Sequence, residues 1–147
     1  MNAILITTIL MLTSCNCVDN YIKPPIKVER EVTYTRVGLA SHYSVKTNGG
    51  RHTASGEKLS DGSYTAAHPS LPFGSKVKVT NLKNNKTAIV RINNRGPYAV
   101  KHGRAIRPLR PHPSRIIDVS QAVAYKLGFH ESGITKVKIE VIKTEIQ

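Results

Sequence analysis

The chain has 147 residues, of which 39% are hydrophobic, which is enough for the core of one domain and excludes a second core. Trp is absent and only 5% of the residues are aromatic, so the core must be built from Val, Ile and Leu. The 22 Lys and Arg residues against 9 acidic residues give a formal net charge of +13, which favours an anionic partner, or else a basic surface without a dedicated partner.

Residues 1–14 are predicted to be a signal peptide. The apolar run from Ala3 to Leu12 is broken only by two Thr residues, and it is shorter than the roughly 20 residues that a membrane-spanning helix needs. Leu12-Thr13-Ser14-Cys15 resembles the bacterial lipobox, which implies cleavage after Ser14 and a lipid on Cys15. The alternative is that Cys15 and Cys17 are incidental or form a disulfide, although so short a loop strains the bond.

An exported lipoprotein is expected in the cell envelope, held at a membrane by the lipid on Cys15. The residue after this Cys is Asn16 and not Asp, which resembles lipoproteins that are sorted to the outer membrane. The expected location is therefore the periplasmic face of the outer membrane, with the cell membrane as the alternative. Export argues against a nucleic-acid partner, and the basic residues also lack the interleaved aromatic residues of single-strand binding surfaces.

Residues 15–35 are predicted to hold the lipidated Cys and a flexible linker, and residues 36–147 to form the folded domain. Val18 to Arg36 is polar, contains Pro24-Pro25 and shows no clear period. The alternative is that the domain already begins with a first strand here, because Glu31 to Thr35 alternates.

Short strands with a period of two fill most of the domain. The clearest hairpin joins residues 76–82 to residues 87–92 across Asn84-Asn85, with Val77 and Val79 facing inward. Further strands are predicted from Val37 onward and at residues 63–67, 115–119 and 136–142. Residues 98–114 are predicted to be a long loop, because their three Pro residues cannot donate to a sheet.

One short helix is predicted after Ser120, which is a favourable N-cap residue. Val123, Ala124 and Leu127 would form its apolar face, and Gly128 stands where a helix commonly ends. Many short strands with one helix indicate a small closed or nearly closed barrel.

Five segments in order resemble the rare lipoprotein A family of septal peptidoglycan proteins, whose fold is a double-psi β-barrel. The resemblance spans about residues 37–142 and implies a mainly β fold, a six-stranded double-psi β-barrel with one short helix. The segments are Gly38-Leu39-Ala40-Ser41-His42-Tyr43, Thr53-Ala54-Ser55-Gly56-Glu57, Thr65-Ala66-Ala67-His68-Pro69-Ser70-Leu71-Pro72-Phe73-Gly74, Arg91-Ile92-Asn93-Asn94-Arg95-Gly96-Pro97 and Arg115-Ile116-Ile117-Asp118-Val119-Ser120.

The resemblance implies a lytic transglycosylase that acts on peptidoglycan during cell-wall remodelling and septation. Such an enzyme cleaves the β-1,4 bond between N-acetylmuramic acid and N-acetylglucosamine by attack of the muramyl 6-hydroxyl, leaving a 1,6-anhydro product. The reaction needs a proton donor, a proton acceptor and stabilisation of an oxocarbenium-like state. One carboxyl group can serve in both proton roles if its pKa is raised. No cofactor and no metal are expected.

The resemblance also carries catalytic residues onto this sequence. Glu57 is expected to be the acid and base, and His68 a hydrogen-bonding partner in the site, or else a residue that satisfies the turn before Pro69. The family's Asn-Asp-Arg-Gly-Pro reads Asn-Asn-Arg-Gly-Pro here, so Asn94 replaces the expected catalytic Asp and cannot exchange a proton near neutral pH. Three alternatives follow: Glu57 acts alone, Asp118 compensates, or the domain binds the glycan without cleaving it. The position of Asp118 at a strand end favours a structural hydrogen-bonding role.

Substrate-binding residues are expected around this centre. Arg95 is expected to support the site, and Tyr43 and Tyr98 to provide platforms for sugar rings, with core packing an equal alternative for Tyr43.

The loop that follows is longer than the family's and carries four basic residues that either meet the carboxylates of peptidoglycan stem peptides or remain solvated. Some family members carry a C-terminal peptidoglycan-binding module, and none is expected after the last strand here. The basic residues are Lys101, Arg104, Arg107 and Arg110.

Overall fold

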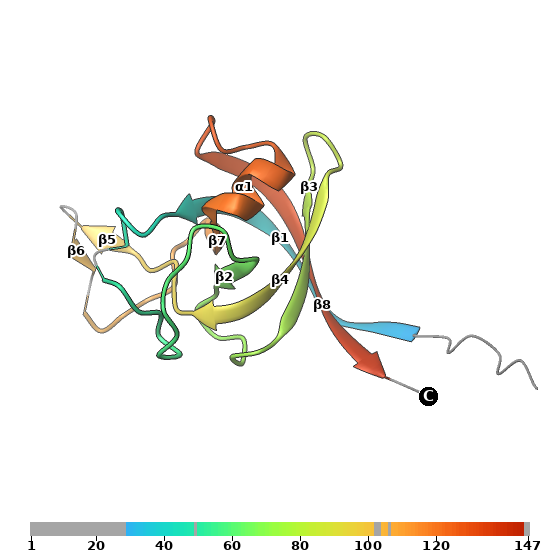
Figure 1. Ribbon diagram of the computed structural model, residues 1–147, viewed down its shortest axis with the longest axis horizontal. Coiled ribbons are helices and arrows are strands. Elements are labelled where there is room, and N and C mark those ends of the chain that lie inside the picture. The colour runs from blue at the N-terminus through green and yellow to red at the C-terminus, as the bar shows by residue number, and fades with distance from the viewer. Residues whose placement is uncertain (1–28, 49, 102–103, 106, 146–147) are drawn as a thin grey trace, which may run out of the picture.

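The computed structural model describes residues 29–48, 50–101, 104–105 and 107–145, which form a barrel with one helix packed against it (Figure 1). The predicted signal peptide, Cys15 and linker residues 15–28 lie outside the described residues. Within those ranges, no helix is long and apolar enough to cross a membrane.

Six strands close into a barrel in the order β1-β7-β2-β4-β3-β8, and β5 and β6 form a separate two-stranded sheet. Within the barrel, β1 with β7 and β2 with β4 are parallel pairs, and the other four pairs are antiparallel. The predicted fold class is therefore confirmed. The elements are β1 (Glu29–Tyr43), β2 (Thr65–Ala67), β3 (Lys76–Asn81), β4 (Thr87–Asn94), β5 (Val100–Lys101), β6 (Arg104–Ala105), β7 (Arg115–Ser120), α1 (Gln121–Leu127) and β8 (Ile134–Glu145).

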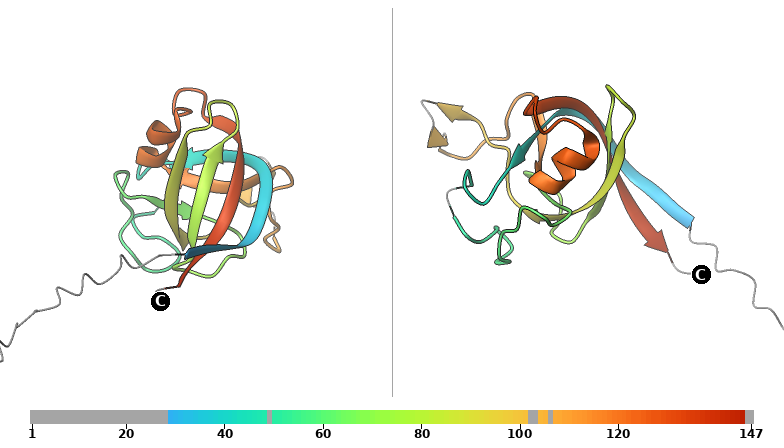
Figure 2. Two further views of the ribbon diagram at one scale, coloured as in Figure 1. Left: turned by 90° about the vertical axis from the view of Figure 1, so that its right-hand side faces the viewer. Right: turned by 45° about the horizontal axis from the view of Figure 1, so that its top comes forward.

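The first strand begins earlier than the predicted domain boundary at residue 36. From Glu29 onward β1 pairs with β8, and the two strands continue beyond the barrel as a ribbon (Figure 2). The linker prediction is therefore wrong for residues 29–35, and the alternative of a first strand is correct. Residues 32–37 are exposed, and a strand exposed in this way can have a polar composition that resembles a linker.

The predicted hairpin is confirmed as β3 and β4. Val77 pairs with Val90 and Val79 with Ala88, and both β3 valines are fully buried. Burial of such aliphatic side chains supplies most of the stabilisation of a barrel interior. The largest buried aliphatic side chains come from four strands and the helix, as the aromatic-poor composition requires: Ile92, Ile117, Leu127, Ile139, Val77, Val79, Val90, Val119, Val123 and Val137.

The helix forms where predicted, and it buries Val123, Ala124 and Leu127 against the barrel. Gly128 ends it in the left-handed conformation, with φ 72°. Ser120 occupies the N-cap position, but its hydroxyl donates to the carbonyl of Ser63 and does not cap the helix. Ser120 thus ties the segment before β2 to the start of the helix.

The segment predicted as one long loop at residues 98–114 contains the small β5–β6 sheet and a bridge between Tyr98 and Pro111. Of the basic residues expected here, Arg107 and Arg110 are exposed. The side chains of Lys101 and Arg104 lie outside the described part of the chain.

Candidate active site

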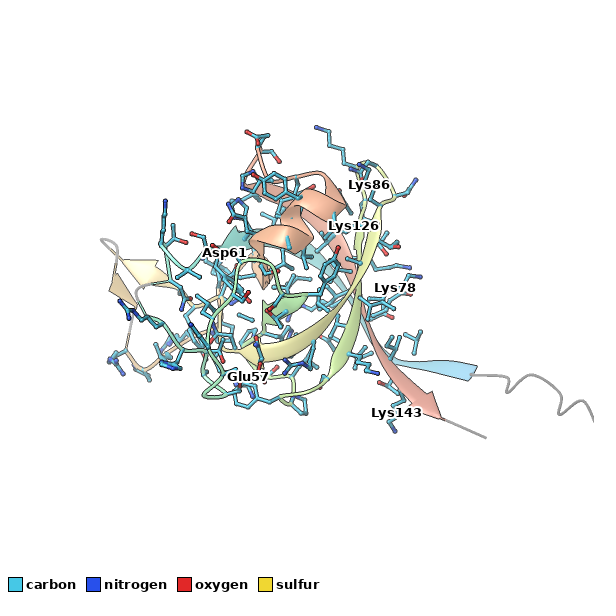
Figure 3. All side chains as sticks on the ribbon, viewed as in Figure 1. Glu57, Asp61, Lys78, Lys86, Lys126 and Lys143 are labelled. Carbon is cyan, nitrogen blue, oxygen red and sulfur yellow. The ribbon has the colours of Figure 1, made fainter. Side chains whose placement is uncertain are left out.

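Glu57 lies in the long loop between β1 and β2, and this loop is tied to the end of β4. The backbone N–H of Ala54 donates to Oδ1 of Asn94 at 2.9 Å, and the N–H of Ser55 donates to the carbonyl of Asn93 at 3.2 Å. Gly56 turns the loop with φ 88°, a conformation that favours glycine. The structure therefore brings the loop of Glu57 and Asn94 to one edge of the barrel, a proximity that the sequence alone did not show. In the view of Figure 3, this edge lies across the barrel from α1.

Two side chains of β4 hold the Glu57 carboxylate. Arg91 donates from Nη1 and Nη2 to Oε1 and Oε2 at 2.6 and 2.8 Å, and Nδ2 of Asn93 donates to Oε2 at 3.0 Å. Arg91 and Asn93 are two residues apart on one strand and project to the same side. Their hydrogen bonds, first from Arg91 and then from Asn93, lower the pKa of Glu57 to about 2. The prediction that Glu57 is both acid and base needs a raised pKa, whereas this arrangement favours the ionised carboxylate, which suits a base and not an acid. The acid role of Glu57 stays a prediction.

Asn94 ends β4 and is buried, with 8% of its surface exposed. Its Oδ1 accepts hydrogen bonds from the backbone N–H groups of Ala54 and Arg95, both at 2.9 Å. A carboxylate oxygen would accept the same two bonds, so Asn94 preserves the local backbone structure that an Asp would give.

His68 follows β2 and is almost fully buried, with 2% exposed. Its Nδ1 accepts from the backbone N–H groups of Ser70 and Leu71 at 3.2 and 3.0 Å, so the neutral ring carries its proton on Nε2. Burial, followed by the charges of Arg36 and Arg95, lowers the pKa of His68 to about 4. His68 satisfies the turn after Pro69, and in the described part of the chain its Nε2 has no hydrogen-bond partner.

Arg95 supports the segment after His68. Its Nη1 donates to the carbonyls of His68 and Leu71 at 3.2 and 2.7 Å, and the guanidinium stacks 3.8 Å above the Phe73 ring. The predicted supporting role of Arg95 is compatible with these contacts. Phe73 lies within one of the family-like segments, but no pattern in the sequence indicated that its ring would contact Arg95.

The two predicted tyrosine platforms have different surroundings. Tyr43 is buried, packs with Leu59 and Ala67, and its hydroxyl lies 3.1 Å from Oγ1 of Thr65. The expectation of a sugar platform at Tyr43 is therefore wrong, and its ring belongs to the core. Tyr98 is half-buried and borders Gly96, and its sugar-platform role stays a prediction.

A second carboxyl group, Asp118, lies on β7 two strands away from Asn94. Ala67 of β2 pairs with Asn94 on one side and with Asp118 on the other. The hydroxyl of Ser41 donates to Oδ1 of Asp118, and Nη1 of Arg115 lies 3.7 Å from the same oxygen. Burial raises the pKa of Asp118, and the Ser41 bond and the charge of Arg115 only partly offset this effect.

A family model described as lytic transglycolase matches residues 35–139. The chain is 46% identical over 109 residues to the endolytic peptidoglycan transglycosylase RlpA of Neisseria meningitidis serogroup A, which covers 74% of this chain and 40% of that protein. It is 44% identical over 114 residues to the protein of the same name in Pasteurella multocida, which covers 78% of this chain and 34% of that protein. The chain thus spans well under half the length of these relatives.

Two solved structures share the fold. The Streptomyces papain inhibitor matches with a TM-score of 0.54 at 18% identity, over 76% of this chain and 97% of that chain. The apo expansin of Clavibacter michiganensis matches with a TM-score of 0.51 at 19% identity, over 78% of this chain and 53% of that chain. Both likenesses concern the fold alone.

Proposed function

The chain belongs to the lytic transglycolase family, and from this we propose that its double-psi β-barrel cleaves the β-1,4 bond between N-acetylmuramic acid and N-acetylglucosamine in peptidoglycan. The observation that carries the proposal is the position of Glu57. Its ionised carboxylate is exposed, is bound by Asn93 and is oriented by Arg91, and its loop is bonded to Asn94 through the N–H of Ala54. This places a fixed negative charge beside an amide group and near a second one that can bind sugar hydroxyls.

In the proposed reaction, O6 of the muramyl residue attacks C1 of the same sugar as the bond from C1 to the leaving O4 breaks. The carboxylate of Glu57 stabilises the positive charge that develops at C1, and it accepts the proton of the 6-hydroxyl as the new bond forms. Asn94 contributes hydrogen bonds to the glycan from its side-chain amide, and Tyr98 supplies a face for a sugar ring. His68 takes part from behind the site, where its Nδ1 holds the turn after Pro69. Arg95 keeps the segment around His68 in place.

The location proposed is the cell envelope, where the substrate is found. A lipid on Cys15 would hold the barrel at a membrane, at the periplasmic face of the outer membrane or at the cell membrane. Incorporation of labelled palmitate in cells tests this anchor. The Cys15→Ala variant should lose the label, whereas the matched Cys17→Ala variant should keep it; labelled Cys15→Ala protein contradicts the anchor.

The activity is tested by digesting purified sacculi with the purified protein and analysing the soluble products by mass spectrometry. Products that end in 1,6-anhydro-muramic acid are expected from the wild-type protein. They should fall by about 100-fold or more in the Glu57→Gln variant, which removes the charge but keeps the shape. If the wild-type protein binds sacculi and releases no anhydro products, the domain is a non-catalytic glycan-binding module.

A further inference from the structure

We propose that Asp118 is the proton donor to the leaving sugar oxygen. It is then the second carboxyl group of the site and complements Glu57, in a chain that has Asn94 where the family has an Asp. This inference rests on the proposed transglycosylase function. It assigns the acid role to a group other than Glu57, whose hydrogen bonds with Arg91 and Asn93 favour the ionised carboxylate.

The sheet places Asp118 in the same part of the barrel as the motif that holds Asn94. Ala67 pairs with both residues, so their backbones are two strand spacings apart, which is about 10 Å. The turn that follows Asn94 then approaches Asp118 directly. A Cβ atom built on Gly96 would lie 3.9 Å from Oδ2 of Asp118 and 3.9 Å from Cδ2 of Tyr98. The carboxyl group and the predicted sugar platform therefore border the same point of the chain.

The hydrogen bonds around Asp118 determine which oxygen carries a proton. Nη1 of Arg115 donates to Oγ of Ser41 at 2.9 Å, so the hydroxyl hydrogen of Ser41 is free to point to Oδ1 of Asp118. Oδ1 is thereby occupied as an acceptor, and a proton on the carboxyl group resides on Oδ2. Oδ2 makes no hydrogen bond with any residue that the structure describes, and it faces Gly96. It is the atom from which a proton can be given to a substrate.

The surroundings of Asp118 and Glu57 shift the pKa values of the two carboxyl groups in opposite directions. Burial raises the pKa of Asp118, and the groups that face it and oppose this effect are Ser41, Arg115, His112 and His42. Glu57 is exposed and held by a cation, so its pKa is lowered. A pair of carboxyl groups whose pKa values are separated in this way is the usual arrangement of an acid and a base in one active site.

The step balances in protons and electrons. The proton on Oδ2 of Asp118 moves to O4 as the bond from C1 to O4 breaks, and the electron pair of that bond stays on O4. The bond from O6 to C1 forms, and the proton of the 6-hydroxyl moves to Glu57. Both carboxyl groups return to their starting states by exchange with solvent, and no water is added to the sugar.

The first test compares two substrates with the Asp118→Asn variant. On sacculi, this variant should release anhydro products about 100-fold more slowly than the wild-type protein. On a muramyl oligosaccharide with a 2,4-dinitrophenyl leaving group, which departs without a proton, its rate should come within about tenfold of the wild-type rate. Glu131→Gln, which removes an exposed carboxylate elsewhere, should cleave both substrates as the wild-type protein does.

Thermal unfolding of Asp118→Asn shows whether the variant folds. The assignment is overturned if a folded Asp118→Asn protein cleaves sacculi at the wild-type rate. It is also overturned if the cleavage rates on both substrates fall by the same factor. A wild-type protein that cleaves neither substrate instead overturns the proposed function itself. The two failures are therefore separate observations.

The second test moves the pKa of Asp118 without touching its carboxyl group. Arg115→Gln removes a cation that stabilises the ionised form, so the pKa of Asp118 should rise further. An acid must be protonated to act, so the high-pH limb of the kcat/KM profile should move to higher pH. Lys126→Gln, which removes an exposed cation of α1, is the matched control. If the high-pH limb of the kcat/KM profile of Arg115→Gln lies at the same pH as that of the wild-type protein, Asp118 is excluded as the acid.

Discussion

The guanidinium of Arg91 donates two parallel hydrogen bonds, 2.6 and 2.8 Å long, to the carboxylate of Glu57, which lies 34 positions earlier in the chain. Both side chains are more than 40% exposed, so the pair contributes little to stability. Its consequence is chemical, because the paired geometry fixes the orientation of the carboxylate and favours its ionised form.

Replacing Arg91 by Gln should raise the pKa of Glu57 from about 2 toward its ordinary value. Because Glu57 must be ionised to accept a proton, the low-pH limb of the activity profile should move to higher pH. NMR titration of the Glu57 side-chain carboxyl carbon measures the pKa directly. Lys76→Gln, which removes the exposed cation paired in register with Arg91, should leave it unchanged. An unaltered titration in Arg91→Gln would show that Asn93 alone sets the pKa.

Replacing Asn94 by Asp should increase the release of anhydro products about tenfold without loss of stability. The backbone N–H groups of Ala54 and Arg95 would favour the ionised form of the new carboxyl group, which adds a second negative charge near the developing cation. The rate of product release from sacculi is the measurement. Since the introduced carboxylate carries no proton, it should not rescue Asp118→Asn; a rescued double variant would contradict the assignment of the acid.

The buried His68 should make the protein less stable on acidification. Its pKa is about 4 in the folded chain and 6.5 as the ordinary value, so the unfolded chain binds the extra proton first. The stability linked to His68 is therefore fully present above pH 6.5 and is lost as the pH falls toward 4. Urea unfolding at pH 7 and pH 4.5 should show this loss in the wild-type protein and a smaller loss in His68→Gln. Equal losses in both proteins would assign the effect to other groups.

Two asparagines that contact the same carbonyl should differ in their effect on stability. Asn81 is 1% exposed; it donates to the carbonyl of Leu127 at 2.9 Å and accepts from Lys83 and Thr135. Asn84 donates to the same carbonyl at 3.0 Å but is exposed.

Asn81→Ala should lower the free energy of unfolding by about 2–4 kcal/mol, because it leaves buried polar groups without partners. Asn84→Ala should lower it by only about 0.5–1 kcal/mol, because water replaces the lost bonds. Denaturant unfolding of both variants measures the difference. Equal losses would show that the shared contact at the end of α1 matters more than burial.

The strands and the helix of the barrel were predictable because each buries one face. Val77 and Val79 alternate with Lys residues, and Val123, Ala124 and Leu127 follow the helical period, so local pattern and burial agree. The start of β1 was not predictable in this way. Residues 32–37 are exposed, and the partner strand β8 lies about a hundred residues away in the sequence.

The candidate site was likewise predictable from local motifs only in part. The family motifs pointed to Glu57, His68 and Asn94, but the protonation states of Glu57 and His68 depend on neighbours from other segments. Arg91 reads as an ordinary outward residue of a strand with a period of two, and only the folded loop brings Glu57 to it. Ser41 and Asp118 are 77 positions apart, and a parallel strand pair makes them neighbours.

Ala67 sets the distance between the backbone segments of Asn94 and Asp118, because it pairs with both. This buried residue ends the shortest strand of the barrel, three residues long, and the backbone of that strand separates the segment of Asn94 from that of Asp118. The backbone distance between the segments of Asn94 and Asp118 is consequently set by strand pairing. It does not depend on the conformations of flexible side chains. Enlarging the methyl group of Ala67 would press on Tyr43 and Leu59 beneath the loop of Glu57, so the dimensions of the reactive edge and the packing of its loop cannot change independently.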